Sequence, residues 1–323
     1  MVADMFCCWT MMAEILEPTP ENIVEAARRL EEGEAVAFPT ETVYGIGANA
    51  RNSAAVEKVF LHKHRSMGNP LGICYRDLAQ ASGDMVVTAH AAALAEAFLP
   101  GPITLLLERR CDASVSPLCS AGTNKIGVRI SSNGILQNLL AQISFPLATS
   151  SANRSSAISP TTAALALKQL QSVENLIILD GGSCEIGIES TLLDASEEDS
   201  LIIVRNGAIS PEEIYVTTGI LCKNAETRPA HHYTFHKKIV LNATSADPQD
   251  ALLAFGTPCT CQCLRVLNLS ENGDLQEAAS HLFAMLQILD NSSAEKICVM
   301  PIPFKGIGIA INDRLIKAAG GSE

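Results

Sequence analysis

The sequence predicts an α/β protein with two units, a large one over residues 19–209 and a small one over residues 238–323. Short apolar runs of strand length alternate with stretches of helical periodicity, which is the pattern of helices packed on a buried sheet. This alternation of strands and helices stops near residue 221, and a shorter alternating series begins near residue 238. Of the 323 residues, 47% are hydrophobic and only 18% are charged, so the chain can bury sizeable cores.

The first expected elements are a capped helix and the strand that follows it. In "TPENIVEAARRLEEG", Thr19 can cap the helix, Pro20 suits its first position and Gly33 can end it. The apolar face of this helix comprises Ile23, Ala26, Ala27 and Leu30. "AVAF" then predicts a buried strand running into the loop "PTETVYGIG", and a second helix is expected from about Ser53 to Lys63. Residues 1–18 are interpreted as an N-terminal lead.

The remaining elements follow in order. Further strands are predicted at "TLLLE", "IGVRI", "PLATS", "LIILD", "STLLD" and "LIIVR", with helices in "TAHAAALAEAFLPG" and "SPTTAALALKQL". Residues 210–237 are interpreted as a connecting helix and a polar linker. In the small unit we expect strands at "KIVL", "LRVLNL" and "KICVM", and helices at "PQDALLAFG", "GDLQEAASHLFAMLQILD" and "GIAINDRLIKAA".

Charge and cysteine usage narrow the class of protein. The formal net charge is -12, and such an acidic chain is not expected to bind nucleic acid tightly, because that binding depends on broad neutralisation of phosphates. No run approaches the roughly 18 to 20 apolar residues that span a bilayer, so no membrane association is expected. The eleven scattered cysteines favour reduced thiols and a cytoplasmic location. We interpret the "CTCQC" group, Cys259, Cys261 and Cys263, as structural and expect no protein metal site.

Polar, glycine-bearing turns follow several predicted strands, and basic residues lie beside them. Ligands of open α/β sheets bind at strand ends, where loops present backbone N–H groups and hydroxyls. Guanidinium and ammonium groups there could hold phosphates and a carboxylate together. The basic residues at or beside such ends are Lys63, Arg65, Lys125, Arg129 and Arg205. No Walker-type loop, G-x-S-x-G elbow or H-E-x-x-H motif is present, so covalent catalysis has no candidate.

The motifs, taken in order, resemble the YrdC-like domain of threonylcarbamoyl-AMP synthases. They are "FPTETVYGIGANA", "KHRSMGNPLGI", "LPGPITLLLE", "GVRI", "PLATSSANRSSAISPTT", "ILDGGSCEIGIESTLLD" and "IIVRNGAIS". The tail, with "GIGIAINDRLIKAA", is similar to the small C-terminal domain of the two-domain members. The resemblance implies a large twisted mixed sheet around a positively lined cavity, plus a smaller Rossmann-like domain.

The resemblance also implies an activity. Such enzymes make threonylcarbamoyl-AMP from L-threonine, bicarbonate and ATP, with Mg2+, and release pyrophosphate. The product is passed to a tRNA threonylcarbamoyl transferase system. Lys63 and Arg65 are the implied catalytic residues. The implied ATP contacts are Arg65, Asn69, Lys125, Ser151, Asn153, Ser159, Arg205 and Tyr233, and the implied threonine contacts are Thr40, Thr42, Cys74, Arg129, Thr149 and Ser190.

Three positions depart from the family pattern. Ser66 stands where the family has Pro, and Cys74 stands where it has a histidine that can hydrogen-bond to substrate. The linker offers "RPAHHYTF", in which only His232 and Tyr233 align with the family motif. Three alternatives therefore stay open: an RNA-binding protein, a noncatalytic family member, and a module of the hydrogenase-maturation type. Ser159, which precedes Pro160, could equally be an ordinary helix cap.

Overall fold

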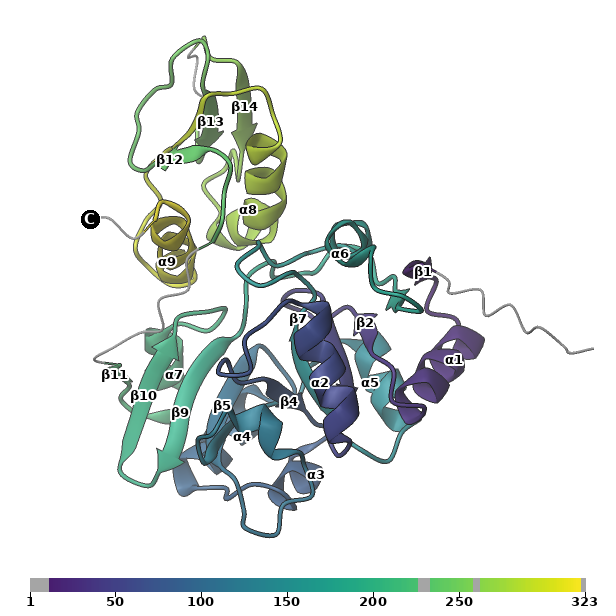
Figure 1. Cartoon of the computed structure of the whole chain (residues 1–323). Coiled ribbons are helices and arrows are strands. Elements are labelled where there is room, and N and C mark those ends of the chain that lie inside the picture. Colours follow the sequence, from purple (N-terminus) through teal and green to yellow (C-terminus); the bar gives the residue numbers. More distant parts are fainter. Residues whose placement is uncertain (1–11, 226–232, 258–261, 321–323) are drawn as a thin grey trace, which may run out of the picture.

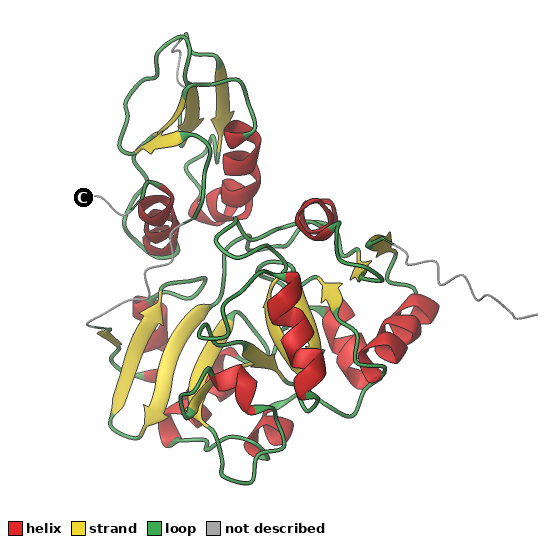
Figure 2. Cartoon of the chain, viewed as in Figure 1, coloured by secondary structure: helices red, strands yellow, loops and turns green. Residues whose placement is uncertain are grey.

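The computed structural model describes residues 12–225, 233–257 and 262–320. Within these residues the chain forms an eleven-stranded mixed sheet and a four-stranded parallel sheet, each with its own helices (Figure 1). Figure 2 shows the small sheet and its helices as a lobe set against one end of the large unit. The predicted fold class, a large mixed sheet plus a smaller α/β unit, is confirmed.

The large sheet mixes parallel and antiparallel neighbours, in the order β1-β8-β2-β3-β7-β4-β6-β5-β9-β10-β11. Pairs such as β4·β6 and β5·β9 are parallel, whereas β5·β6 and β3·β7 are antiparallel. Its strands are β1 (Glu14–Leu16), β2 (Val36–Phe38), β3 (Gly45–Asn49), β4 (Gly72–Cys74), β5 (Ile103–Glu108), β6 (Lys125–Arg129), β7 (Leu147–Ser151), β8 (Ile177–Leu179), β9 (Thr191–Glu197), β10 (Ser200–Arg205) and β11 (Lys223–Asn224).

The helices of the large unit begin where capping side chains predict. Thr19 caps α1, Asn52 caps α2 and Thr88 caps α4, each side chain accepting a backbone N–H of the first turn. These helices are α1 (Pro20–Glu31), α2 (Ser53–His62), α3 (Leu78–Ser82), α4 (Ala89–Phe98), α5 (Gly134–Ala141), α6 (Ala163–Leu170) and α7 (Pro211–Thr218), with a short 3-10 helix at Pro117–Ser120.

Of the strands of the large sheet, β1, β3, β4 and β11 were not predicted. The glycine-rich segment read as part of a loop is β3, which pairs with β2 and β7. Glycine weakens a strand, but here it is needed: a Cβ at Gly45 would come within 2.9 Å of the Phe38 ring, and one at Gly47 within 2.9 Å of Thr149. β4 extends the same sheet. β1, within the range assigned to the N-terminal lead, pairs with β8 and so belongs to the sheet.

The two faces of the large sheet are covered differently. On one face, side chains such as Ile126, Val128 and Leu105 pack in a core with α2, α4 and α6. On the other face, α1 and α5 share a core with Phe38 and Leu147. Because side chains alternate along a strand, Lys125, Gly127 and Arg129 of β6 must lie on the face opposite Ile126 and Val128.

The small unit is a parallel sheet of order β12-β15-β13-β14. Its elements are β12 (Lys238–Val240), β13 (Ala251–Ala254), β14 (Arg265–Asn268), α8 (Leu275–Asp290), β15 (Lys296–Val299) and α9 (Gly308–Ala318). The prediction of a helix at "PQDALLAFG" is wrong, since its apolar residues form β13. A short run that is buried on every side cannot be assigned by periodicity, and pairing with β14 and β15 decides it.

Part of the segment 210–237, which was interpreted as a connecting helix and linker, belongs to the large unit. α7 packs on α4, and β11 pairs with β10. No helix of the described residues is long and apolar enough to cross a bilayer.

Candidate active site

Arg129, the last residue of β6, lies at the centre of a polar cluster made with the loop after β2. Its Nη2 donates to Thr42 Oγ1 at 2.6 Å and to Glu41 Oε1 at 3.0 Å, and reaches Thr40 Oγ1 at 3.4 Å. Glu41 also accepts a hydrogen bond from the Ser131 hydroxyl. Arg129 Nε is buried and has no partner among the described residues. The structure therefore brings together three predicted threonine contacts and leaves one buried donor unused.

Two further predicted threonine contacts, Cys74 and Thr149, lie on β4 and β7 of the same sheet. Cys74 of β4 is opposite Arg129 in the sheet register and is buried, and burial raises the pKa of its thiol to about 11. The side chain is therefore a neutral thiol near neutral pH. Thr149 of β7 is half-buried and donates to the Gly72 carbonyl at 3.5 Å, a long hydrogen bond.

Lys63, which ends α2, does not extend into solvent. Only 1% of the residue is exposed, and its ammonium donates to the main-chain carbonyls of Ser151 and Asn153. Burial, with a smaller contribution from the charge of Arg65, lowers the pKa of Lys63 well below its usual value. Its hydrogen bonds to the two carbonyls fix the end of β7 and the start of the loop that follows it.

Arg65 and Asn69 lie together in the turn after α2. Arg65 Nε donates to the Asn69 carbonyl at 3.1 Å, and its Nη2 donates to the Pro70 carbonyl at 3.0 Å. These bonds fold the guanidinium onto its own turn. His64, between Lys63 and Arg65, has a φ of 49°, a left-handed conformation that starts the turn.

Asn153, in the loop after β7, carries a second unused buried group. Its Nδ2 donates to the carbonyls of Arg154 and Ala157, at 2.8 and 2.7 Å. Its Oδ1 is buried and accepts no hydrogen bond from the described residues. Buried acceptors are normally satisfied, so this oxygen is available to a donor on a ligand.

Glu189, which the sequence analysis did not select, connects several predicted residues. Its Oε1 accepts from the Ser159 hydroxyl at 2.7 Å and from the Tyr233 hydroxyl at 3.2 Å, and its Oε2 accepts from Arg314 Nε at 2.8 Å. Burial would raise the pKa of Glu189, but the charges of Arg314 and Arg205 and the hydrogen bonds outweigh it and hold the pKa at about 2. The alternative reading of Ser159 as a helix cap is wrong, because Thr162 caps α6.

Arg205 and Ser190 meet at the ends of β10 and β9. Arg205 Nη2 donates to the Ser190 carbonyl at 2.9 Å and to its hydroxyl at 3.1 Å. The Ser190 hydroxyl is also 2.7 Å from that of Thr104. Burial lowers the pKa of Arg205, the nearby Glu189 raises it, and the charges of Arg314 and Arg129 lower it. Arg205 is thus close enough to Arg129 for the two charges to interact.

Lys125 lies at the opposite end of β6 from Arg129, about 13 Å along the strand at 3.3 Å per residue. Its Nζ donates to Asp194 of β9 at 2.9 Å, so an acidic partner already offsets its charge. Lys125 therefore does not join the cluster around Arg129. His232 lies outside the described residues, as do Cys259 and Cys261.

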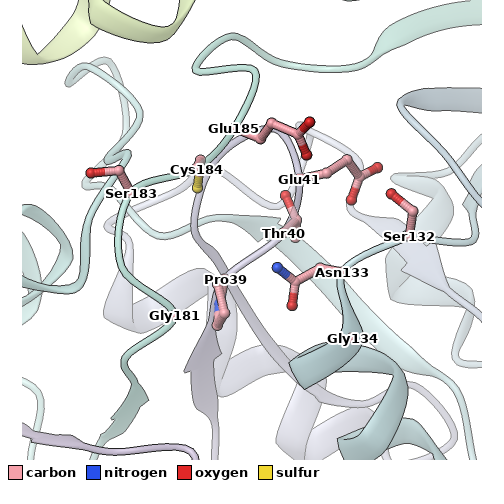
Figure 3. Close-up of a pocket in the computed structure, with 10 residues that line it drawn as sticks. All are labelled: Pro39, Thr40, Glu41, Ser132, Asn133, Gly134, Gly181, Ser183, Cys184 and Glu185. Carbon is pink, nitrogen blue, oxygen red and sulfur yellow. The ribbon is translucent and has the colours of Figure 1, made fainter.

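A cavity of about 300 Å3 adjoins the Thr40 loop, and its lining is shown in Figure 3. Its walls come from three segments: Pro39 to Glu41, Ser132 to Gly134 at the start of α5, and residues 181–185. Thr40 is its one predicted site residue. The cavity therefore adjoins the Arg129 cluster without containing most of the predicted site.

Sequence reasoning missed Glu41, Glu189 and Arg314. Glu41 and Glu189 lie within quoted motifs, but their roles depend on partners far along the chain. Arg314 carried a usable signal: it falls on the same helical face as Ile311, Leu315 and Ala318, at a position expected to be apolar. A charge at a core position requires a buried partner.

Two family models match the chain, one over most of the large unit and one over the small unit together with the segment that precedes it. The model described as "Telomere recombination", for Sua5, YciO and YrdC proteins, matches residues 28–207. The model described as "Threonylcarbamoyl-AMP synthase, C-terminal domain" matches residues 215–320.

Full-length relatives extend this result. Threonylcarbamoyl-AMP synthase of Bacillus subtilis is 31% identical, with 95% of each chain covered. The protein of the same name from Pyrococcus abyssi is 30% identical, covering 91% of this chain and 93% of its own. The crystal structure of P. abyssi Sua5 complexed with L-threonine matches with a TM-score of 0.84 at 28% identity, covering 96% of this chain and 97% of that one. The chain therefore belongs to the threonylcarbamoyl-AMP synthase family.

Proposed function

We propose that this protein is an L-threonylcarbamoyladenylate synthase, which converts L-threonine, bicarbonate and ATP to threonylcarbamoyl-AMP and pyrophosphate. Membership of the family supports the activity. Support for threonine comes from the P. abyssi Sua5 structure, which was determined in complex with L-threonine. The family pattern is present from the first sheet to the last helix, which favours an active enzyme over a noncatalytic or RNA-binding protein.

The observation that carries the proposal is the Arg129 cluster. A partly buried guanidinium, whose buried Nε is unused, lies beside two threonine hydroxyls and is suited to a small zwitterion that carries its own hydroxyl. Arg129 would take the carboxylate of the substrate, and Thr40 and Thr42 would accept from its ammonium or hydroxyl group. Thr149, Ser190 and Cys74 would complete this half of the site, with Cys74 as a weak hydrogen-bonding group.

The nucleotide would lie toward Arg65, Asn153 and Arg205. The unused Asn153 Oδ1 is suited to a hydroxyl or amino donor of the nucleoside. Arg65 would release its turn carbonyls to bind phosphate oxygens, and Lys63 would act from behind by fixing Ser151 and Asn153 and adding charge. The other proposed ATP contacts are Asn69, Lys125, Ser151, Ser159 and Tyr233.

The proposed reaction needs no covalent enzyme intermediate. The amine of threonine attacks CO2 derived from bicarbonate and gives a carbamate. A carbamate oxygen then attacks the α-phosphorus of ATP, the bond to the β-phosphate breaks, and pyrophosphate leaves with its electron pair. Catalysis would come from proximity and from cationic groups that stabilise the developing charge.

We propose Mg2+ as the accompanying ion. Among the described residues no three His, Cys, Asp or Glu side chains are arranged to ligate a metal. The ion would therefore be held mainly by the ATP phosphates, as Mg2+ commonly is, and would neutralise their charge. We further propose that the protein acts in the cytoplasm, with its product taken up by a tRNA threonylcarbamoyl transferase system.

The test is to incubate purified protein with ATP, Mg2+ and bicarbonate, and to measure pyrophosphate release with and without L-threonine. Release that requires both threonine and bicarbonate is expected. L-serine serves as the matched control, since Cys74 replaces a hydrogen-bonding histidine of the family. A folded protein that releases no pyrophosphate under these conditions would contradict the proposal.

A further inference from the structure

Three loops of the candidate site enter the core of the small unit. Val43, Ile158 and Ile188 belong to the large unit in sequence, but they pack in one hydrophobic core with α8, α9 and the small sheet. Each has a polar neighbour in the chain that belongs to the site cluster: Thr42, Ser159 and Glu189 respectively. The small unit therefore supports these polar side chains from behind.

Helix α8 contacts one of these loops directly. A Cβ at Gly187 would come within 2.4 Å of Ser280 Cα, and the φ of Gly187 is +80°, so glycine is required there. The Gly187 N–H donates to the Thr42 carbonyl at 3.0 Å. A backbone contact thus connects α8 to the loop that carries Thr40 and Thr42.

Arg314 of α9 extends from the small unit to the charged part of the site. Its side chain is 1% exposed, and its Nε lies 2.8 Å from Glu189 Oε2. Its Nη2 donates to the Asn206 carbonyl at 2.8 Å, next to Arg205 in the chain. Arg314 therefore contacts both the carboxylate and the loop that lie beside Arg205.

The charges of this group explain why Arg314 is needed. A buried carboxylate requires a compensating cation, and Arg314 supplies one to Glu189. Arg205 donates to Ser190 and makes no hydrogen bond to Glu189 in the described part of the chain, although the two charges interact. With Glu189 neutralised by Arg314, the charge of Arg205 stays available to an anionic ligand.

We propose that Arg314 is a positioning residue for the nucleotide half of the site, which pairs with Glu189 so that Arg205 can bind phosphate. This inference rests on the proposed function, because ATP is the anion that Arg205 would bind. The small unit would then contribute to ATP binding through the charge of Arg314, without touching the substrate.

The test compares the variants Arg314→Met, Arg314→Lys, Glu189→Gln and the double variant Glu189→Gln/Arg314→Met. ATP affinity is measured by isothermal titration calorimetry, and the KM values for ATP and threonine by pyrophosphate release. R314M is expected to weaken ATP binding about tenfold, which is within the range of coupling measured for residues that do not touch the ligand themselves. The KM for threonine should change less than twofold. R314K should fall between wild type and R314M.

The double variant separates an electrostatic role from a structural one. Arg314 also pairs with Asp313, but that carboxylate keeps its ion pair with Lys317 in the variants. Once Glu189 carries no charge, no unpaired anion competes for Arg205, so ATP affinity should recover to within about threefold of wild type, as expected for strongly coupled sites. A purely structural role predicts the opposite, a double variant that binds ATP no better than R314M. If R314M does not fold, R314K and the double variant decide the question.

Lys296→Met is the matched control. Lys296 pairs with the buried Asp250 inside the small unit, so its loss should lower the thermal midpoint without changing ATP affinity. An R314M protein whose ATP affinity changes no more than that of K296M would overturn the inference. If wild type binds ATP but releases no pyrophosphate, the proposed function fails while the ATP affinities still test Arg314. If wild type does not bind ATP, both fail.

Discussion

Arg129 and Arg205 each end a strand of the large sheet, but different parts of the chain hold them. Arg129 is held by Thr42 and Glu41, which lie in a loop of the large unit. Arg205 lies beside Glu189, and that carboxylate is paired with Arg314 from the small unit. The comparison indicates that the charge of Arg129 is balanced within the large unit, whereas the charges around Arg205 are balanced by a residue of the small unit. Substitutions should therefore affect the two halves separately.

Arg65 should give the largest effect. Replacing it with alanine removes a cation that would stabilise charge on the reacting phosphates, and such losses typically lower kcat about 100- to 1000-fold. Its hydrogen bonds stay within its own turn, so the thermal midpoint should change little. Steady-state pyrophosphate release and a thermal melt measure both quantities. Near-normal turnover would remove Arg65 from the site.

Arg129→Met should give the next largest effect, confined to the amino-acid half. Loss of a charge-assisted contact to the carboxylate costs about 2 kcal/mol, which corresponds to a rise of about 30-fold in the KM for threonine. ATP affinity by calorimetry should stay within about twofold of wild type. Arg28→Met, in an exposed ion pair on α1, is the control and should change neither constant. A matching loss of ATP affinity in R129M would contradict the separation of the two halves.

The smallest effect concerns the contact between the units and its dependence on pH. The pKa of Glu189 is held at about 2, below its ordinary value of 4.5, so the unfolded chain takes up a proton first as the pH falls. Its stabilisation is present above pH 4.5 and is lost as the pH falls toward 2. Between pH 5.5 and 3.5 this amounts to about 1 kcal/mol in the free energy of unfolding.

Urea unfolding of wild type and Glu189→Gln at the two pH values measures this contribution. Other carboxylates titrate in both proteins, so the difference between their pH dependences isolates Glu189. The wild-type protein should lose about 1 kcal/mol more than E189Q. Equal losses would show that Arg314 and Arg205 do not depress the pKa of Glu189 in the folded chain.

The sequence predicted the fold best where a signal was local. The cap at Thr19 and an apolar face at helical spacing located α1 almost to the residue, and α2 was expected within one residue of its observed ends. β3 was missed because its glycines carry no strand propensity, and contact with Phe38 and Thr149 selects them. β13 was taken as a helix because alanine and leucine favour helices, and only pairing within the small sheet overrides that preference.

The candidate site shows the same division. Arg129 could be selected as a lone charge in an apolar strand, and the structure supplies the partner that such a charge requires. Which way Lys63 points could not be predicted, since its carbonyl acceptors lie about 90 residues away. The pair of Glu189 and Arg314, 125 residues apart, depends on how the two units dock, which no local pattern encodes.

The core shared by the two units has a consequence for how the chain unfolds. Separation of the two units would expose the apolar side chains of Val43, Ile158 and Ile188 to water. It would also break the ion pair between Glu189 and Arg314. The two units should therefore unfold together, although the sequence divides between them near residue 210. Heat should melt the protein in a single cooperative transition, and a boundary drawn from sequence would cut through its most tightly coupled region.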